Sequence, residues 1–370
     1  MKRYKKTIRK IHLWLGLITG PIVFIVALTG AIYAFQEEIQ NATQEYRFVQ
    51  EQNKDFLPPS VLIDSANAVN PGKHVHAVMY HTRNKAAQVI YYKNNEYYDF
   101  VYVDPYSGNV KQIHDVKSSF FGWILEGHFN LWLPRTIGVP IIVVSMIIFT
   151  LLIISGLILW WPKKKKNRKQ KFTIKWKARW RRKNYDLHSV LGFYTMIFAL
   201  LFILTGLMWG FPWFKSLVYK AASGGEEYVS YYEPESKAPL PEQAPAIDRV
   251  WQEMNERYPK AEWIEIHIPH DSLHTIAANA NPDASTYWKT NYLYFDQQTL
   301  DTKPVDHQYG SREDAGFAKT LMRMNYDIHV GGIAGIPGKT LMCIISLIIA
   351  SLPVTGFLIW YGRRKKKRNS

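Results

Sequence analysis

Four long apolar runs alternate with polar segments along the chain. They cover residues 13–35, 137–161, 190–211 and 339–361. Each run has about the 20 residues that a helix needs to cross the hydrocarbon layer of a bilayer. Charged residues are absent from all four runs apart from Lys339, at the edge of the last one. The first run is too long for the core of a signal peptide and is expected to be retained. The pattern predicts a membrane protein with four transmembrane α-helices.

Basic residues predict how these helices are oriented. The chain has 46 Lys and Arg against 30 Asp and Glu, a formal net charge of +16. Residues 1–10 hold six of the basic residues, 163–183 hold thirteen and 363–368 hold six, with no acidic residue among them. Because cytoplasmic loops carry the Lys and Arg excess, we expect these three segments inside and both termini cytoplasmic. The positive charge therefore indicates a bilayer partner and no nucleic acid.

Seven segments follow from the spans and their orientation. They are an inner basic segment with the first span (1–35), a first outer domain (36–135), the second span (136–161), a cytoplasmic basic loop (162–187), the third span (188–213), a second outer domain (214–336), and the fourth span with a basic tail (337–370). Both outer domains are expected to be small and α+β in class, and to lie outside the cytoplasm.

Alternating and β-branched positions predict the elements of the outer domains. In the first, we expect a helix over 59–69 and strands over 75–80, 87–92 and 98–103, closed by a turn at 104–108. In the second, we expect a helix over 246–258, strands over 263–268 and 291–295, and a corresponding turn at 296–299.

The second half of the chain repeats the first. His12, Gly16, Thr29 and Gly30 recur with the same spacing as His188, Gly192, Thr205 and Gly206. Ser155 and Gly156 near the end of the second span likewise recur as Thr355 and Gly356 in the fourth. Both copies run outward and then inward, which predicts two parallel repeats about an axis along the membrane normal.

One histidine lies just before each span. The repeat makes the first equivalent to the third and the second equivalent to the fourth. They are His12, His128, His188 and His329, with His128 lying 28 residues before Gly156 and His329 lying 27 before Gly356. A polar group at a membrane helix end is costly and usually has a partner, so a duplicated set suggests a repeated metal or haem site. An interfacial polar role is the simpler alternative for each histidine alone.

Depth in the membrane limits which histidines can share a metal. His12 and His188 adjoin inner basic clusters, whereas His128 and His329 precede spans that run inward. The hydrocarbon layer is about 30 Å thick, while a metal–nitrogen bond is about 2 Å. We therefore expect His12 to pair with His188 and His128 to pair with His329, one pair for each leaflet.

Two glycines lie one helical turn after the inner histidines. Gly16 and Gly192 fall on the same helix face as His12 and His188. The missing side chain would let a flat macrocycle lie against the helix, although small residues also serve close packing between spans. Gly30 and Gly206 are interpreted as packing glycines only.

Other cofactor chemistry has little support in the sequence. The single cysteine, Cys343, lies inside the fourth span and rules out a cysteine-based metal site within the chain. His267, His270 and His274 form a histidine-rich stretch, but Pro269 interrupts any helix that would align them. We interpret them as surface histidines, with metal binding as the lesser alternative.

These features resemble the PepSY-associated transmembrane family, the iron-regulated membrane proteins that include siderophore-iron reductases of the bacterial inner membrane. The resemblance rests on the repeated His–Gly and Thr–Gly positions, on the segments around His128 and His329, and on the Asp-Pro-Tyr-Ser-Gly turn at 104–108. It implies PepSY-like outer domains, haem b bound by the span histidines, and reduction of ferric chelates at the outer face. The second turn, at 296–300, departs from the pattern because Leu300 replaces the final glycine.

The leading hypothesis is a dihaem inner-membrane oxidoreductase with two bis-histidine haem b groups. It would take electrons from quinol or a soluble reductase and pass them to a ferric siderophore or another metal chelate. The alternative is a non-enzymatic PepSY-type sensor or peptidase-inhibitor module. A metal permease ranks last, because the spans lack the buried carboxylates of an ion path and Pro353 is the one candidate helix break in the middle of a span.

Overall fold

The computed structural model describes residues 2–94, 96–162, 168–237 and 244–368. Its chain forms two compact units. The helical unit comprises Met1–Gln36, Trp123–Lys215 and Ile328–Ser370, and the sheet unit comprises Glu37–Gly122 and Ser216–Asp327. Residues 163–167 of the expected basic loop lie outside the described residues.

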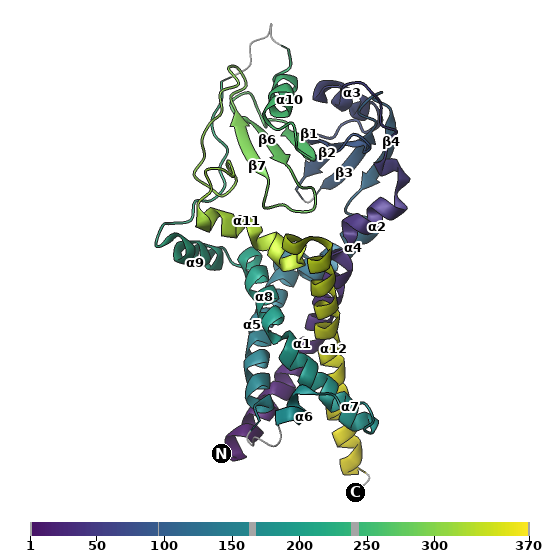
Figure 1. The fold of residues 1–370 in the computed structure, drawn as a ribbon, viewed down its shortest axis with the longest axis vertical. Helices are drawn as coiled ribbons and strands as arrows, with labels where there is room; N and C mark the ends of the chain where they lie inside the picture. Colours follow the sequence, from purple (N-terminus) through teal and green to yellow (C-terminus); the bar gives the residue numbers. More distant parts are fainter. Residues whose placement is uncertain (1, 95, 163–167, 238–243, 369–370) are drawn as a thin grey trace. The chain divides into compact units, whose positions relative to one another are not determined.

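Long apolar helices make up the helical unit (Figure 1). They are α1 (Lys2–Tyr33), α5 (Arg135–Trp160), α7 (Trp180–Asp186) continuing through a π-helical turn (Leu187–Leu191) into α8 (Gly192–Gly210), and α12 (Gly335–Arg368). In the part of the chain that the structure describes, four stretches are long and apolar enough to cross a membrane: Arg3–Tyr33, Arg135–Trp160, Trp180–Gly210 and Gly332–Arg364. The four predicted transmembrane helices are confirmed, and α12 continues through Pro353 without a break.

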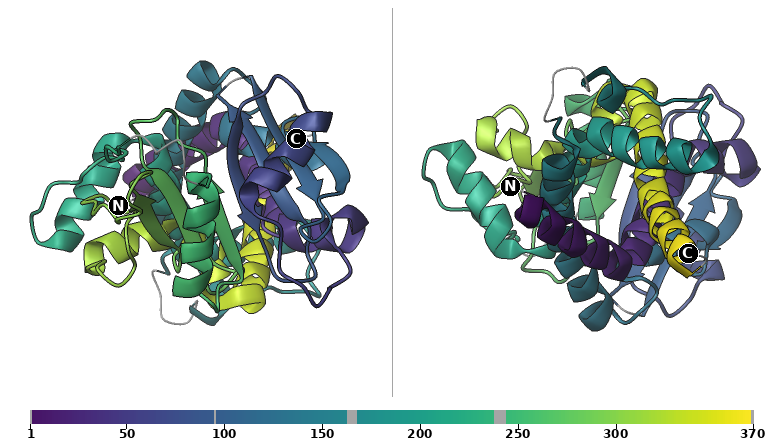
Figure 2. Two further views of the ribbon diagram at one scale, coloured as in Figure 1. Left: turned by 90° about the horizontal axis from the view of Figure 1, so that it is seen from above. Right: turned by 90° about the horizontal axis from the view of Figure 1, so that it is seen from below.

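The four spanning helices form a bundle in which each helix packs against two neighbours. α1 contacts α5 and α12, and α8 contacts the same two helices, so α1 and α8 lie diagonally opposite. Figure 2 (right) shows the unit from the end at which α1 begins and α12 ends. Apolar side chains fill the middle of the bundle, with Val23, Ala199, Ile345 and Ile349 buried there beside Phe149, Phe198 and Phe202.

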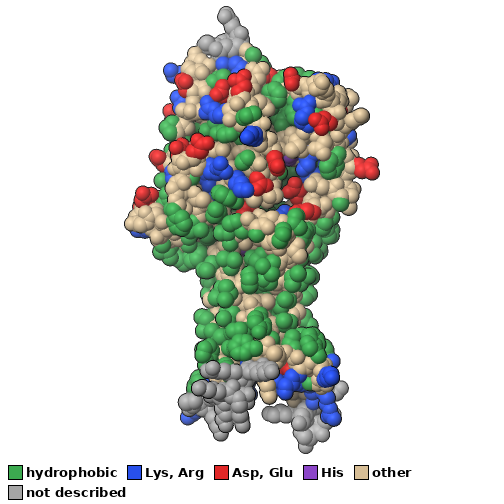
Figure 3. Space-filling model, in the orientation of Figure 1, with side chains coloured by type: hydrophobic (Ala, Val, Ile, Leu, Met, Phe, Trp, Pro, Cys, Tyr) green, Lys and Arg blue, Asp and Glu red, His purple; other side chains and the backbone are tan. Residues whose placement is uncertain are grey.

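The outer surface of the bundle is apolar. Ile18 and Ile197 are 66% and 68% exposed, and hydrophobic side chains cover the visible face of these helices (Figure 3). An apolar surface of this extent is unfavourable in water but suits hydrocarbon. The protein is therefore a membrane protein.

Shorter helices accompany the spans. They are α2 (Gln36–Thr43), a 3₁₀ turn (Glu45–Arg47), α4 (Phe120–Asn130), α6 (Arg168–Phe172), α9 (Pro212–Ser223), α11 (Phe317–Val330) and a second 3₁₀ turn (Gly332–Ala334). The histidine-bearing ends of α4 and α11 belong to the helical unit. The expected ranges 36–135 and 214–336 grouped them with the outer segments instead.

Within the described residues, the other unit contains an antiparallel sheet of seven strands. The strands are β1 (Val75–Tyr80), β2 (Ala87–Lys93), β3 (Tyr97–Val103), β4 (Val110–Asp115), β5 (Trp263–His267), β6 (Ile276–Asn281) and β7 (Asn291–Phe295). Their order is β4-β3-β2-β1-β5-β6-β7. β1 pairs with β5 over a register that sets Ala77 opposite His267 and Tyr80 opposite Ile264. The two expected α+β segments thus share one sheet.

Two helices cover the same face of this sheet. α3 (Pro59–Val69) buries Leu62 and Ala66 against β1, β2 and β3, and α10 (Ala246–Arg257) buries Val250 and Met254 against β5 and β6. Trp251 packs against both cores. The amide and hydroxyl of Ser60 donate hydrogen bonds to the Asp248 carboxylate, which ties α3 to α10.

The turn at 296–300 keeps the geometry of the turn at 104–108 despite lacking glycine. Gly108 has φ +75° and Leu300 has φ +63°. Gly108 N–H donates to Asp104 O at 2.9 Å, and Leu300 N–H donates to Asp296 O at 3.0 Å. A non-glycine residue in this region costs about 1–2 kcal/mol. The second half of the sheet therefore accepts strain that the first half avoids.

The turn before α12 generates a test of the helical packing. Gly331 has φ +81°, and a Cβ there would lie 2.4 Å from Gly338 O. We expect Gly331→Ala to lower the stability of the protein in detergent by about 2 kcal/mol or more, because backbone strain and overlap act together. Thermal unfolding in detergent is the measurement. Gly362→Ala is the control, since a Cβ there meets nothing within 4 Å. Equal melting temperatures for the two variants would contradict this account of the turn.

Candidate functional site

The four span histidines form two pairs inside the helical unit. The ring centroids of His12 and His188 are 6.4 Å apart with an interplanar angle of 85°. Those of His128 and His329 are 6.2 Å apart at 72°. These are the two pairs expected from depth in the membrane. The first lies toward the beginning of α1, and the second contacts the other end of that helix.

Each imidazole meets a serine or threonine hydroxyl from another helix of its own repeat. The Nδ1–hydroxyl distances are 2.8 Å for His12 with Ser155, 3.4 Å for His128 with Thr29, 3.0 Å for His188 with Thr355 and 2.7 Å for His329 with Thr205. In the first repeat the histidine of α1 contacts the hydroxyl on α5, and the histidine of α4 contacts the hydroxyl on α1. In the second repeat α8, α12 and α11 do the same. The contact pattern repeats as the sequence does.

Backbone carbonyls determine the direction of these hydrogen bonds. Thr205 Oγ1 donates its proton to Leu201 O at 2.6 Å, and Thr29 Oγ1 donates to Ile25 O at 2.7 Å. Ser155 and Thr355 donate to carbonyls in the same way. Each hydroxyl oxygen can then accept from the imidazole Nδ1–H.

Direct carbonyl contacts support the same proton position. His128 Nδ1 lies 2.9 Å from Val26 O, and His188 Nδ1 lies 3.1 Å from Leu352 O. Because a carbonyl oxygen only accepts, Nδ1 carries the proton in the neutral ring. Nε2 then keeps its lone pair, which is the form of imidazole that ligates a metal.

A glycine follows every one of these hydroxyl residues and faces the same imidazole. A Cβ would lie 2.9 Å from His128 Cε1 at Gly30, 3.4 Å from His12 Cε1 at Gly156, 3.8 Å from His329 Cε1 at Gly206 and 3.2 Å from His188 Cε1 at Gly356. Gly30 and Gly206 therefore pack against the candidate ligands themselves. The Ser/Thr–Gly pairs are visible in the sequence as part of the repeat, but no local pattern indicates that the histidines are their partners.

Gly16 and Gly192 occupy a different environment. The nearest side-chain atom to a Cβ is 3.8 Å away at both positions, on Leu152 for Gly16 and on Leu352 for Gly192. This is ordinary van der Waals contact, so helix packing does not require glycine at either position. The expected role of both residues beside a flat macrocycle stays a prediction.

Local backbone features bring the histidines to these positions. His188 lies in the π-helical turn Leu187–Leu191, a feature that often marks functional positions in helices. The unequal spacings after His128 and His329 arise in the connections to α5 and α12. The first connection contains Leu131 and Trp132 at φ +58°, and the second contains Gly331 and Gly335 at positive φ. The one-residue difference leaves Ser155 and Thr355 equivalent.

Distance along the helices separates the two pairs. His12 and Thr29, which contact different pairs, are 17 residues apart on α1, and His188 and Thr205 are also 17 apart. At 1.5 Å per residue this separation is roughly 25 Å. The apolar side chains around Phe202 fill the intervening bundle.

The imidazole spacing suits one metal ion per pair. Two metal–nitrogen bonds of about 2 Å each, together with the radii of two imidazole rings, add to roughly 6 Å. No group of three or more His, Cys, Asp or Glu side chains within the described ranges could hold a metal ion. Two imidazoles are the number that a haem iron takes from a protein when both axial sites are filled. The residues present therefore fit a haem between each pair.

The histidines of the sheet unit include a different kind of cluster. His76 on β1 and His267 on β5 have ring centroids 4.9 Å apart, across the seam between the two halves of the sheet. His267 Nε2 lies 3.2 Å from Glu265 Oε2, and Asn279 donates to the same carboxylate at 2.9 Å. His270 and His274 lie outside the strands, with ring centroids 6.2 Å apart.

Charge pairing explains the titration of this seam. Although burial opposes it, the neighbouring Glu265 carboxylate raises the pKa of His267. Burial raises the pKa of Glu265, but the positive charge of His267 and the hydrogen bonds from His267 and Asn279 outweigh it. The pKa of Glu265 is lowered to about 2. Burial and the positive charge of His267 lower the pKa of His76. The Glu265–His267 pair is thus ionised from about pH 2 up to the raised pKa of His267.

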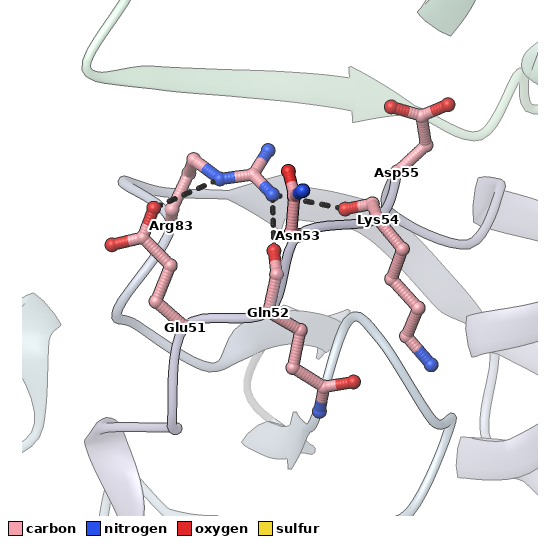
Figure 4. A pocket seen from close by; sticks show the side chains of 6 residues that line it. All are labelled: Glu51, Gln52, Asn53, Lys54, Asp55 and Arg83. Atoms are coloured by element: carbon pink, nitrogen blue, oxygen red, sulfur yellow. Dashed lines mark hydrogen bonds and ion pairs between the residues drawn. The ribbon is translucent and has the colours of Figure 1, made fainter.

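A surface pocket of the sheet unit holds an arginine whose hydrogen bonds are made within the chain (Figure 4). Arg83 donates to Glu51 Oε1 at 3.1 Å, to Lys54 O at 3.0 Å and to Gln52 O. Asn53 and Asp55 complete the lining. Because the guanidinium anchors the surrounding loop, we assign the pocket no ligand.

The ion pair at the seam generates a pH-dependent test. We expect Glu265→Gln to lower the stability of the sheet unit by about 1–3 kcal/mol at pH 6, since it leaves a charged histidine without its partner. The loss should fall as the pH is raised to 9, because loss of the His267 proton removes the ion pair from the wild-type protein. Thermal unfolding at the two pH values is the measurement, with the exposed Glu256→Gln as a matched control. A loss that does not depend on pH would refute ion pairing as its cause.

Comparison with known proteins supports one assignment. No curated protein matches the chain significantly. The family described as PepSY-associated TM region matches residues 9–363, a range that includes all four span histidines and their hydroxyl partners. The chain therefore belongs to the family of the PepSY-associated TM region.

Proposed function

We propose that the protein is a dihaem oxidoreductase of the bacterial inner membrane that passes electrons to a ferric siderophore or another metal chelate. The supporting observation is that the four histidines form two pairs, with ring centroids 6.4 and 6.2 Å apart. The Nδ1 atom of every ring makes a hydrogen bond within the protein. A chain that only sensed a ligand or inhibited a peptidase would not need this arrangement.

The four histidines would hold two haem b groups. His12 and His188 would hold one, and His128 and His329 would hold the other. A haem iron with two axial imidazoles carries one electron at a time and leaves no site for oxygen. The hydroxyls and carbonyls at Nδ1 would orient each ring.

The proposed direction of electron flow follows from charge. The basic ends of α1 and α12 lie at the same end of the bundle (Figure 1). Because Lys and Arg accumulate on the cytoplasmic side, this end would face the cytoplasm and receive electrons from quinol or a soluble reductase. The sheet unit would then be extracytoplasmic and the His128–His329 centre would be the outer one.

The acceptor is proposed from coordination chemistry and from the family. Ferric iron is held tightly by the hard oxygen ligands of chelates, and reduction weakens that hold. His128 and His329 would hold the haem that supplies one electron to each ferric ion, and the ferrous iron formed would leave the chelate more readily. The histidines act as metal ligands and take no part in proton transfer.

Single histidine variants test the ligand assignment. We expect His12→Ala and His128→Ala each to lose about one of two haems per chain, because each variant removes one axial ligand from a different centre. Pyridine haemochrome assays of the purified proteins are the measurement. His74→Ala, an exposed histidine of the sheet unit, is the control and should keep both haems. Full haem content in His12→Ala and His128→Ala would rule out these ligands.

Re-oxidation of reduced protein tests the reaction. The protein is reduced under anaerobic conditions and mixed with a ferric hydroxamate or a ferric catecholate, and the haem spectrum and ferrous product are followed. We expect one ferrous ion for each electron lost. If no ferric chelate re-oxidises a haem-replete protein, the reductase proposal fails and the sensor or inhibitor alternative takes its place.

A further inference from the structure

Equivalent positions in the two repeats contact the candidate ligands of one centre. Thr29 on α1 and Thr205 on α8 each lie 17 residues after the histidine that begins their repeat. Both are buried, at 5% and 6% exposure. Their hydroxyls face His128 and His329, the two histidines proposed to share a haem.

The two hydrogen bonds differ in strength. Thr205 Oγ1 lies 2.7 Å from His329 Nδ1, whereas Thr29 Oγ1 lies 3.4 Å from His128 Nδ1. His128 Nδ1 has a closer acceptor in Val26 O at 2.9 Å. Among the described residues, the acceptor observed for His329 Nδ1 is the Thr205 hydroxyl, and no backbone carbonyl accompanies it. One ligand of the pair therefore depends on a side chain and the other on the backbone.

The surroundings of His329 leave little to replace this hydroxyl. The rings of Phe202 and Trp209 have centroids 5.5 and 5.2 Å from that of His329. Thr205 Oγ1 already donates to Leu201 O at 2.6 Å, so its oxygen is directed to the imidazole as an acceptor. A valine at this position would have the same shape but would leave Nδ1–H facing apolar groups.

We propose that Thr205 is the positioning residue that sets the basicity of His329 and thereby the reduction potential of the His128–His329 centre. This inference rests on the proposed haem ligation. An acceptor at Nδ1 makes the imidazole a stronger donor through Nε2. A stronger axial donor favours ferric over ferrous iron, so the hydrogen bond lowers the potential. Thr29 contributes less, because Val26 O already serves His128.

Potentiometric titration of three variants tests the proposal. Loss of a partner that orients a metal-bound histidine changes metal affinity by about 10–100-fold. We expect Thr205→Val to weaken the preference for ferric iron about tenfold, which raises one of the two potentials by about 59 mV for a single electron. Thr29→Val is the matched control and should shift the potential by much less. Thr205→Ser keeps the hydroxyl and should restore the wild-type value.

Failure of the proposed function and failure of the role of Thr205 give different results. A wild-type protein without haem would remove the proposed function itself. Two haems whose potentials are unchanged in Thr205→Val, or shifted equally in Thr29→Val, would overturn the role of Thr205 alone. If Thr205→Val loses haem, Thr205→Cys and Thr205→Ser give the same comparison, because sulfur is a weak acceptor at similar volume. Equal potentials in those two variants would also overturn it.

Discussion

The hydrogen bond between a histidine Nδ1 and a hydroxyl on a neighbouring helix is the interaction on which the candidate site depends. An imidazole in an apolar bundle has two nitrogens, and an unsatisfied one is costly. Ser155, Thr355 and Thr205 accept hydrogen bonds from the Nδ1 atoms of their histidines, and His128 Nδ1 has Val26 O as its closer acceptor beside Thr29. Nε2 is left as the atom able to bind a metal. These contacts orient the rings and favour the tautomer that carries its proton on Nδ1.

Because of the internal repeat, this local contact recurs at two pairs of histidines. Within each repeat two histidines contact hydroxyls on two other helices. Each histidine also lies beside the equivalent histidine of the other repeat. Residues at equivalent positions of the two repeats therefore contact the two histidines of the same pair. Where their contacts differ, the two histidines of that pair have different surroundings. Thr205 and Thr29 are such a case, with hydrogen bonds of 2.7 and 3.4 Å. The arrangement allows two centres on one scaffold to have unequal properties.

Hydrophobic periodicity was sufficient to predict the spans and most of the sheet. The helix at 59–69 and the strand at 75–80 are observed with those bounds, because their bulky residues face a buried core. β4 and β6 were not predicted, since Val110–Asp115 is mostly polar and Ile276–Asn281 is built from Ala and Asn, which are depleted in strands. Pairing of β1 with β5 joins residues far apart in the chain, and no local pattern specifies it.

The candidate site was predictable in part for a similar reason. The four histidines and their pairing were predicted from depth in the membrane and from the repeat. Both features can be recognised in each segment of the sequence by itself. The partners of Nδ1 depend on how α1, α5, α8 and α12 are rotated about their axes, and this is decided by packing of whole helices. The Ser/Thr–Gly pairs therefore stood out as a repeat while their contact with the imidazoles stayed hidden.

The central claim is that each imidazole pair holds one haem b. The most direct measurement is the haem content of the wild-type protein purified in detergent after haem-replete expression, combined with electron paramagnetic resonance of its ferric form. The account predicts two haems per chain, both low-spin because each iron has two axial imidazoles. A protein that folds and contains no haem, or that binds haem only in a high-spin form, would contradict it.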